Sequence, residues 1–169
     1  EKLENCINSD LANNYGNLCQ RVISFNDKNC NLSIPDNINF EKDDLKLLNK
    51  VSDNINLLRS YIDNQKLSVY TNFIVDCLFD SNKYFNDQEP WKKKDDVKRL
   101  NTIVYVSLEI IRKLSILLNP IMPDTSLKVL DVFGIKQKDI KFESIKDHKI
   151  LVHNSKIKKI EILFNKIEK

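Results

Sequence analysis

Glycine, methionine and tryptophan are scarce in this sequence. Its 169 residues include two glycines, one methionine and one tryptophan. So little glycine leaves few residues for β-turns or a phosphate-cradling loop, and it favours helices. The chain also lacks a long uninterrupted apolar run, because Glu109, Arg112 and Lys113 divide the most apolar stretch, residues 103–118. We therefore expect no membrane contact.

The common motifs of self-contained catalysis are also missing. The sequence contains no G-x-S-x-G, H-E-x-x-H, G-x-x-x-x-G-K or G-x-G-x-x-G. None of its four cysteines forms a C-x-x-C pair, and its two histidines, His148 and His153, are five residues apart, which suits a shared metal poorly. We expect no catalytic residue, cofactor or metal in this chain, and reduced thiols of a cytoplasmic protein.

The net charge is also small, with a formal value of only +3. A whole-molecule polyelectrolyte is excluded, so any affinity for nucleic acid must come from a local patch. The paired carboxylates Asp43-Asp44 and Asp95-Asp96 precede or open predicted helices. There they are expected to cap the helix and to interact with its dipole.

Apolar residues recur at helical spacing in four long stretches. Pro90 ends the third stretch, and a short fifth helix fits 124–133, with Gly134 able to adopt the left-handed conformation beyond its end. Long helices with short connections favour an all-α antiparallel bundle. A C-terminal tail, 135–169, has weaker periodicity and is expected to be extended, with a short helix or strand. The four long stretches are residues 2–25, 42–63, 66–88 and 95–118.

Asn17 and Arg21 are four residues apart and therefore share one face of the first predicted helix. An amide both donates and accepts hydrogen bonds, and a guanidinium is a rigid fork of donors. Together they could read the edge of an unpaired base. A solvated polar face is the alternative, and the spacing alone favours it.

Trp91 follows Pro90 and leads directly into Lys92, Lys93 and Lys94, with Lys98 and Arg99 close behind. Single-stranded RNA is commonly bound by aromatic rings that stack on bases and by cations that hold phosphates. This segment contains both kinds of group. In the alternative interpretation, Trp91 covers the open end of the bundle and the lysines keep the surface soluble.

Four segments resemble the anticodon-binding domain of methionyl-tRNA synthetase, in the expected order and over essentially the whole chain. The first is "NSDLANNYGNLCQRVISF", residues 8–25, which resembles the opening helix of that domain. The second is "NKYFNDQEPW", residues 82–91, at the end of the third helix. The others are "LNPIMPDTSLKVLDVFGI", residues 118–135, and the closing signature "LFNKIEK", residues 163–169. Glu89 stands where the family often has a small residue, and Asn165 replaces a usual proline.

The resemblance implies a helix bundle attached to a Rossmann catalytic domain and binding the CAU anticodon of tRNA(Met). The tryptophan of the family's Pro-Trp pair stacks on anticodon bases, which corresponds to Trp91. The asparagine and arginine of its N-L-x-x-R motif contact the first anticodon base, cytosine, and correspond to Asn17 and Arg21. We infer that Lys92, Lys93 and Lys94 lie near the RNA backbone.

The resemblance further implies a division of the chain at residue 150. Residues 1–149 would form the helical anticodon-binding domain, and residues 150–169 a tail that packs towards a catalytic domain absent from this sequence. The parent enzyme would use ATP to attach methionine to tRNA. This sequence begins at Glu1, so we expect an excised or processed portion of a longer chain. The ATP-binding elements of the parent enzyme are not in it, so we expect it to be inactive alone. We also expect it to be monomeric.

Two other functions remain open at this point. The chain could be the helical domain of another class I synthetase, for cysteine or a branched-chain amino acid. It could instead be a helical protein-interaction module without an RNA partner, in which Trp91 is a hydrophobic anchor.

Overall fold

The structure is a computed structural model that describes residues 2–159, with side chains from residue 9 onward. In this part of the chain, β-structure is limited to one isolated bridge between Ser33 and Lys156, and no helix is long and apolar enough to cross a membrane. The predicted all-α class is confirmed. The helices are α1 (Lys2–Cys30), α2 (Lys42–Ser52), α3 (Ile55–Asp63), α4 (Leu67–Gln88), α5 (Val97–Leu118), α6 (Pro123–Val132) and α7 (Phe142–Ile145), with 3₁₀ turns at Pro90–Lys92 and Gln137–Asp139.

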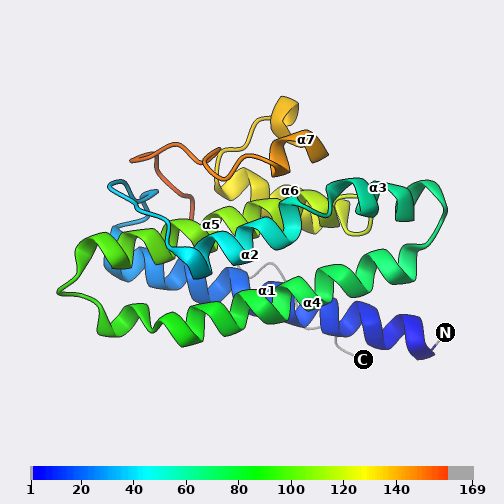
Figure 1. Cartoon of the computed structure of the whole chain (residues 1–169), viewed down its shortest axis with the longest axis horizontal. Helices are drawn as coiled ribbons and strands as arrows, with labels where there is room; N and C mark the ends of the chain where they lie inside the picture. Colours follow the sequence, from blue (N-terminus) through cyan, green and yellow to red (C-terminus); the bar gives the residue numbers. More distant parts are fainter. Residues whose placement is uncertain (1, 160–169) are drawn as a thin grey trace.

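Helix α5 lies at the centre of the bundle, and α1, α2, α4 and α6 all pack against it (Figure 1). Every α5 residue from Thr102 to Leu118 is buried. The long helices alternate in direction along the chain, as predicted. As a result α1 and α4, which are not consecutive, lie side by side and run the same way.

The helix predicted over residues 42–63 is interrupted, and α2 and α3 are separated at Asp53 and Asn54. At the break the Asn54 amide group donates to the Lys50 carbonyl at 2.7 Å, and the Asn54 backbone N–H bonds Val51 instead. The Ser52 hydroxyl likewise donates to the Leu48 carbonyl at 3.1 Å. Short polar side chains that bond nearby backbone in this way compete with the helical pattern. The apolar stripe predicted the faces correctly but not this break.

The observed ends of the other helices agree closely with the predicted ones, except that α1 continues to Cys30 instead of stopping near Phe25. Gly134 has the expected left-handed conformation, with φ of 69°. Its N–H donates to the Asp131 carbonyl at 3.0 Å, and Ile135 N–H donates to the Leu130 carbonyl at 3.0 Å. This pair of bonds is a Schellman motif, which satisfies carbonyls at the end of α6.

Two of the charged residues that divide the apolar run form a buried ion pair on α5. The Arg112 Nε lies 2.6 Å from a Glu109 carboxylate oxygen, and both side chains are fully buried. Arg112 also donates to the carbonyls of Ser144, at 3.1 Å, and Asp147, at 2.7 Å. Glu109 accepts the Leu151 N–H at 2.8 Å. These two charges therefore fasten the segment after α7 to the bundle, a role that the sequence pattern did not indicate.

Residues 150–158 continue along the bundle and meet the loop that follows α1. Ile34 N–H donates to Ser155 at 2.9 Å, and Ile157 N–H donates to Leu32 at 2.7 Å. Leu151 and Ile157 are both buried. The described part of the tail thus packs on the helical domain. Its expected contact with a catalytic domain stays a prediction, and the closing signature at 163–169 lies outside the described residues.

Lys113 is the third buried charge of α5, and its ammonium group donates to the Ser52 hydroxyl at 3.1 Å and the Asp147 carbonyl at 3.0 Å. It also lies 3.0 Å from Nδ1 of His148, which is half-buried. Burial, reinforced by the charge of Arg112, lowers the pKa of Lys113 to about 7. An unfolded lysine has a pKa near 10.4, so the unfolded chain binds more protons between these values. Stability from this group therefore rises with pH across this window.

Lys113→Met is expected to remove that pH dependence. Between pH 7 and pH 9 the free energy of unfolding of the wild type should rise by about 2 kcal/mol relative to the variant, because each pKa unit is worth about 1.4 kcal/mol. Urea unfolding of both proteins at the two pH values measures this difference. Lys46→Met, which changes an exposed lysine of α2, is the control. Parallel pH profiles for wild type and Lys113→Met would contradict the expectation.

Candidate nucleic-acid interface

Arg21 and Trp91 are 70 positions apart in sequence, and both contact the ring of Phe85 on α4. The Arg21 guanidinium lies 5.2 Å from the Phe85 ring centroid. The Trp91 and Phe85 centroids are 6.1 Å apart, at 61° to each other. Asn17 is exposed one turn before Arg21 on α1. The structure therefore brings α1, the end of α4 and the turn after it to one patch of the surface.

The turn that carries Trp91 begins where α4 ends at Gln88. Glu89 has a left-handed conformation, with φ of 46°, and Pro90 opens the 3₁₀ turn. A proline disfavours the right-handed helical conformation in the residue before it, so the predicted end of this helix is confirmed. The left-handed conformation also explains why a small residue suits position 89. The turn leaves the Trp91 side chain 42% exposed, so one face of the bundle presents an indole to solvent.

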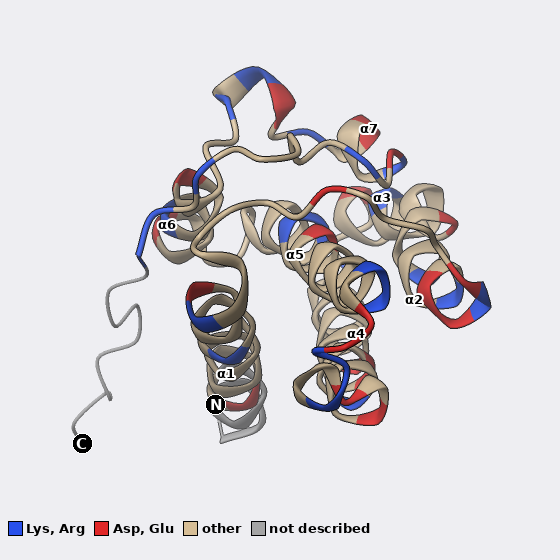
Figure 2. Cartoon of the chain, turned by 90° about the vertical axis from the view of Figure 1, so that its left-hand side faces the viewer, with Lys and Arg blue, Asp and Glu red and all other residues tan. Residues whose placement is uncertain are grey.

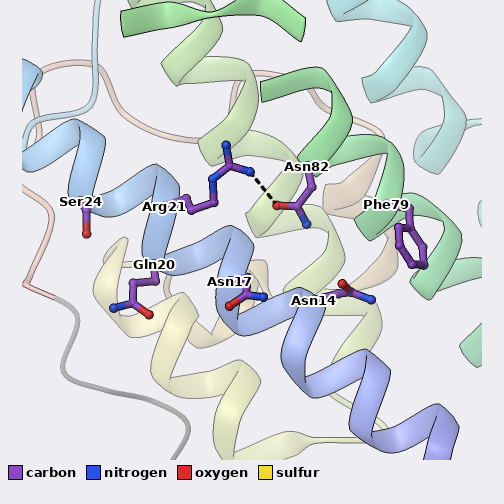
Figure 3. Close-up of a pocket in the computed structure, with 7 residues that line it drawn as sticks. All are labelled: Asn14, Asn17, Gln20, Arg21, Ser24, Phe79 and Asn82. Atoms are coloured by element: carbon purple, nitrogen blue, oxygen red, sulfur yellow. Dashed lines mark hydrogen bonds between the residues drawn. The ribbon is translucent and has the colours of Figure 1, made fainter. Parts of the chain in front are cut away.

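Arg21 is held by neutral groups of α4. Its guanidinium donates to the side-chain oxygen of Asn82 at 3.4 Å (Figure 3). It also donates to the side-chain oxygen of Asn86. Amide oxygens orient a guanidinium without cancelling its charge. Local sequence spacing gave no role at this site to Asn82, Phe85 and Asn86. All three lie within residues 82–91 and recur at helical spacing.

A hollow of about 480 Å³ lies between α1 and α4 next to Arg21. Asparagine and glutamine amides make up much of its wall, and Arg21 is the one charged residue among those described as lining it. Amides offer donors and acceptors together, which suits a polar but uncharged ligand such as the edge of a base. Figure 3 shows the lining residues: Asn14, Asn17, Gln20, Arg21, Ser24, Phe79 and Asn82.

The three lysines after Trp91 are not equivalent. Lys92 pairs with the Glu89 carboxylate at 3.1 Å, and Lys93 donates to the Gln88 carbonyl at the end of α4. Lys94 is exposed. Basic and acidic residues lie close together around this end of the bundle (Figure 2). Lys94 is therefore the lysine best placed to meet a phosphate.

Arg99, which the sequence grouped with this basic cluster, has a structural role instead. Its two terminal nitrogens bind both carboxylate oxygens of Asp44, at 2.7 and 3.0 Å, and one also donates to Gln88 at 2.8 Å. Asp44 is fully buried and also accepts the Tyr84 hydroxyl and the Glu41 N–H. The group therefore joins the start of α2, the end of α4 and the start of α5.

The charge of Asp44 is stabilised by these partners. Burial alone would raise the pKa of Asp44, but hydrogen bonds from Arg99, the Glu41 amide and Tyr84 lower it below its ordinary value. The predicted capping role is present too, because Asp44 and Glu41 form a capping box at the start of α2. Asp96 likewise caps α5, accepting the Arg99 N–H at 3.1 Å.

The described residues contain no candidate metal site. Among them, no group of three or more histidine, cysteine, aspartate or glutamate side chains could hold a metal ion. Cys19 and Cys77 are buried and Cys30 is half-buried, all as free cysteines. Burial raises the pKa of Cys30 to about 11, which keeps the thiol protonated at neutral pH.

The chain is similar to known proteins over nearly its whole length. A family model described as the anticodon binding domain of methionyl tRNA ligase matches residues 34–169. The methionine–tRNA ligase of Thermotoga maritima is 34% identical over 99% of this chain and 27% of its own length. That of Brucella suis is 32% identical over 86% of this chain and 28% of its own length. This chain thus spans about a quarter of these relatives.

A solved structure has the same fold. Mycobacterium tuberculosis methionyl-tRNA synthetase bound by methionyl-adenylate superimposes with a TM-score of 0.87 at 30% identity, covering 98% of this chain and 33% of that one. The family model begins after α1, whereas the Thermotoga and Mycobacterium matches extend over almost the entire chain. The chain therefore belongs to the family of anticodon-binding domains of methionyl-tRNA ligase.

Proposed function

We propose that this chain recognises the CAU anticodon of tRNA(Met), as one domain of an enzyme that attaches methionine to tRNA with ATP. The observation that carries the proposal is the meeting of Arg21 and Trp91 at Phe85, beside an amide-lined hollow. The exposed indole supplies a stacking surface, and the hollow supplies groups that read a base. The parent enzyme is proposed from relatives named methionine–tRNA ligase and from a similar structure that binds methionyl-adenylate.

Trp91 stacks on an unpaired anticodon base in this proposal, and Asn17 with Arg21 reads the first base. Cytosine presents a donor, its exocyclic amine, next to two acceptors, the ring nitrogen N3 and the carbonyl oxygen O2. The Asn17 amide oxygen can accept from the amine while the Arg21 guanidinium donates to the acceptors. Uracil has an acceptor in place of the amine and an N–H donor in place of the N3 acceptor, so the same pair would meet two mismatched groups.

Phosphates of the loop are assigned to Lys94 first, with Lys92 and Lys93 contributing after they exchange their present partners. We further propose a monomeric, cytoplasmic protein with no membrane partner, whose tail reaches its own catalytic domain. The family membership argues against a domain for cysteine or a branched-chain amino acid. The salt dependence of binding would distinguish an RNA-binding domain from a protein-interaction module, because phosphate contacts weaken steeply with salt.

Arg21→Ala is expected to abolish most of the preference for cytosine at the first anticodon position. A well-matched pair of hydrogen bonds to a base is worth about 1–3 kcal/mol of discrimination, so the preference should fall by about tenfold or more. Dissociation constants of stem-loops that differ only in that base, measured for wild type and variant, test this. Arg59→Ala is the control, since Arg59 is an arginine of α3 that pairs with Glu143.

Two outcomes of this experiment would count against the account. If Arg21→Ala keeps the cytosine preference, Arg21 does not read the base. If the wild type binds every anticodon equally, the proposed function itself is wrong.

A further inference from the structure

We propose that Phe79 is a second stacking platform, which holds a different unpaired base of the anticodon loop from the one on Trp91. This inference rests on the proposed function and extends its site along the groove between α1 and α4. It concerns a residue outside all four segments that carry the family resemblance.

Phe79 is an aromatic ring in solvent on the groove side of α4. Its side chain is 58% exposed, more than that of Trp91. It lies three residues before Asn82 and seven before Asn86, the two residues that hold Arg21, so all three share one face of α4. Phe79 lines the same hollow as Asn14 and Asn17 across the groove (Figure 3). The ring therefore faces the proposed RNA site although it adds nothing to the core.

The spacing between the two rings requires two different bases. Six residues separate Phe79 from Phe85, which is about 9 Å along a helix. The Trp91 ring belongs to the turn after the end of α4, and its centroid is 6.1 Å from that of Phe85. Successive stacked bases are only about 3.4 Å apart. One base cannot cover both rings, whereas a loop with several unpaired nucleotides can place one base on each.

The wall between the rings suits base edges better than charged groups. Asn14 and Gln20 line the hollow and are not needed for the first base, so their amides are available to a second one. The carboxylates that flank Phe79 on α4 are occupied, since Asp76 and Asp80 both pair with Lys50. The hollow is thus lined mostly by neutral polar groups, with Arg21 as its charged residue and the exposed Phe79 ring in its wall. Base–aromatic stacking tolerates any base, so Phe79 would add affinity more than sequence preference.

Phe79→Ala is expected to weaken binding of a CAU anticodon stem-loop by about tenfold, in the range of one lost base stack. Phe79→Tyr, which keeps the ring, should bind almost as tightly as the wild type. Leu67→Ala is the matched control, because Leu67 is 55% exposed on the same helix but does not line the hollow. Circular dichroism of each variant checks that the bundle is intact.

A series of stem-loops, each with one loop nucleotide made abasic, identifies the base. At one loop nucleotide, the losses of affinity from Phe79→Ala and from the abasic change should be non-additive when the two are combined. Trp91→Ala should show the same non-additivity at a different loop nucleotide. Additive losses at every position would overturn the role of Phe79. Unchanged affinity in Phe79→Ala, with weakened affinity in Trp91→Ala, would overturn it too but leave the proposed function standing. Unchanged affinity in both variants would overturn both.

Discussion

Trp91→Ala should weaken binding of a CAU anticodon stem-loop by about 10- to 100-fold, because one base–aromatic stack is worth about 1–3 kcal/mol. The indole is 42% exposed and packs edge-on against the Phe85 ring, so its loss should leave the helices intact. Fluorescence anisotropy of a labelled stem-loop measures the affinity, and circular dichroism measures the helical content.

Two variants distinguish stacking from a general effect at this end of the bundle. Trp91→Phe keeps an aromatic face and should recover most of the affinity. Val97→Ala removes a 59% exposed apolar side chain at the start of α5 and should have no effect. Wild-type affinity in Trp91→Ala would refute the stacking role, and a large loss of helix would make Trp91 a structural residue.

Asp44→Ala should lower the free energy of unfolding by about 3–5 kcal/mol, the usual cost of removing one partner of a buried ion pair. The Arg99 side chain, which is 10% exposed, would lose both of its bonds to the carboxylate. The Tyr84 hydroxyl would lose its acceptor at the same time. Urea unfolding followed by circular dichroism measures the change.

Asp43→Ala is the matched control for this prediction. Asp43 is the neighbouring carboxylate in the first turn of α2 and is exposed, so its removal should cost less than about 1 kcal/mol. Similar losses for the two variants would show that the buried pair contributes nothing beyond helix-end electrostatics. The pair also joins the helices that support the Trp91 turn, so partly unfolded Asp44→Ala should bind RNA weakly for a structural reason.

Helical periodicity predicted most of the fold because the helices packed around α5 each bury one apolar face. It failed at residues 52–54, where side chains bond the local backbone and end α2 without any change in the apolar stripe. It also gave no role to Arg112 and Lys113, whose partners are backbone carbonyls of a segment more than 30 residues away. Contacts of that kind depend on how the chain returns to α5 and leave no periodic signal.

The candidate site was predictable in part for a similar reason. Asn17 and Arg21 share a helix face, and Trp91 stands beside lysines, so local spacing was enough to single them out. Phe85, Asn82 and Phe79 join them only because α1 and α4 pack in parallel, which neither helix alone encodes. The role of Arg99 could not be predicted, because a basic residue near a basic cluster looks the same in sequence, whether a phosphate or a buried carboxylate neutralises it.

The most direct test of the account is a fluorescence titration of the wild-type chain, since Trp91 is its only tryptophan. Adding a CAU anticodon stem-loop should quench the indole emission to saturation, and a loop with a different anticodon should require a concentration about tenfold higher or more. Emission that stays constant while the RNA binds, or an identical response to both loops, would contradict the account.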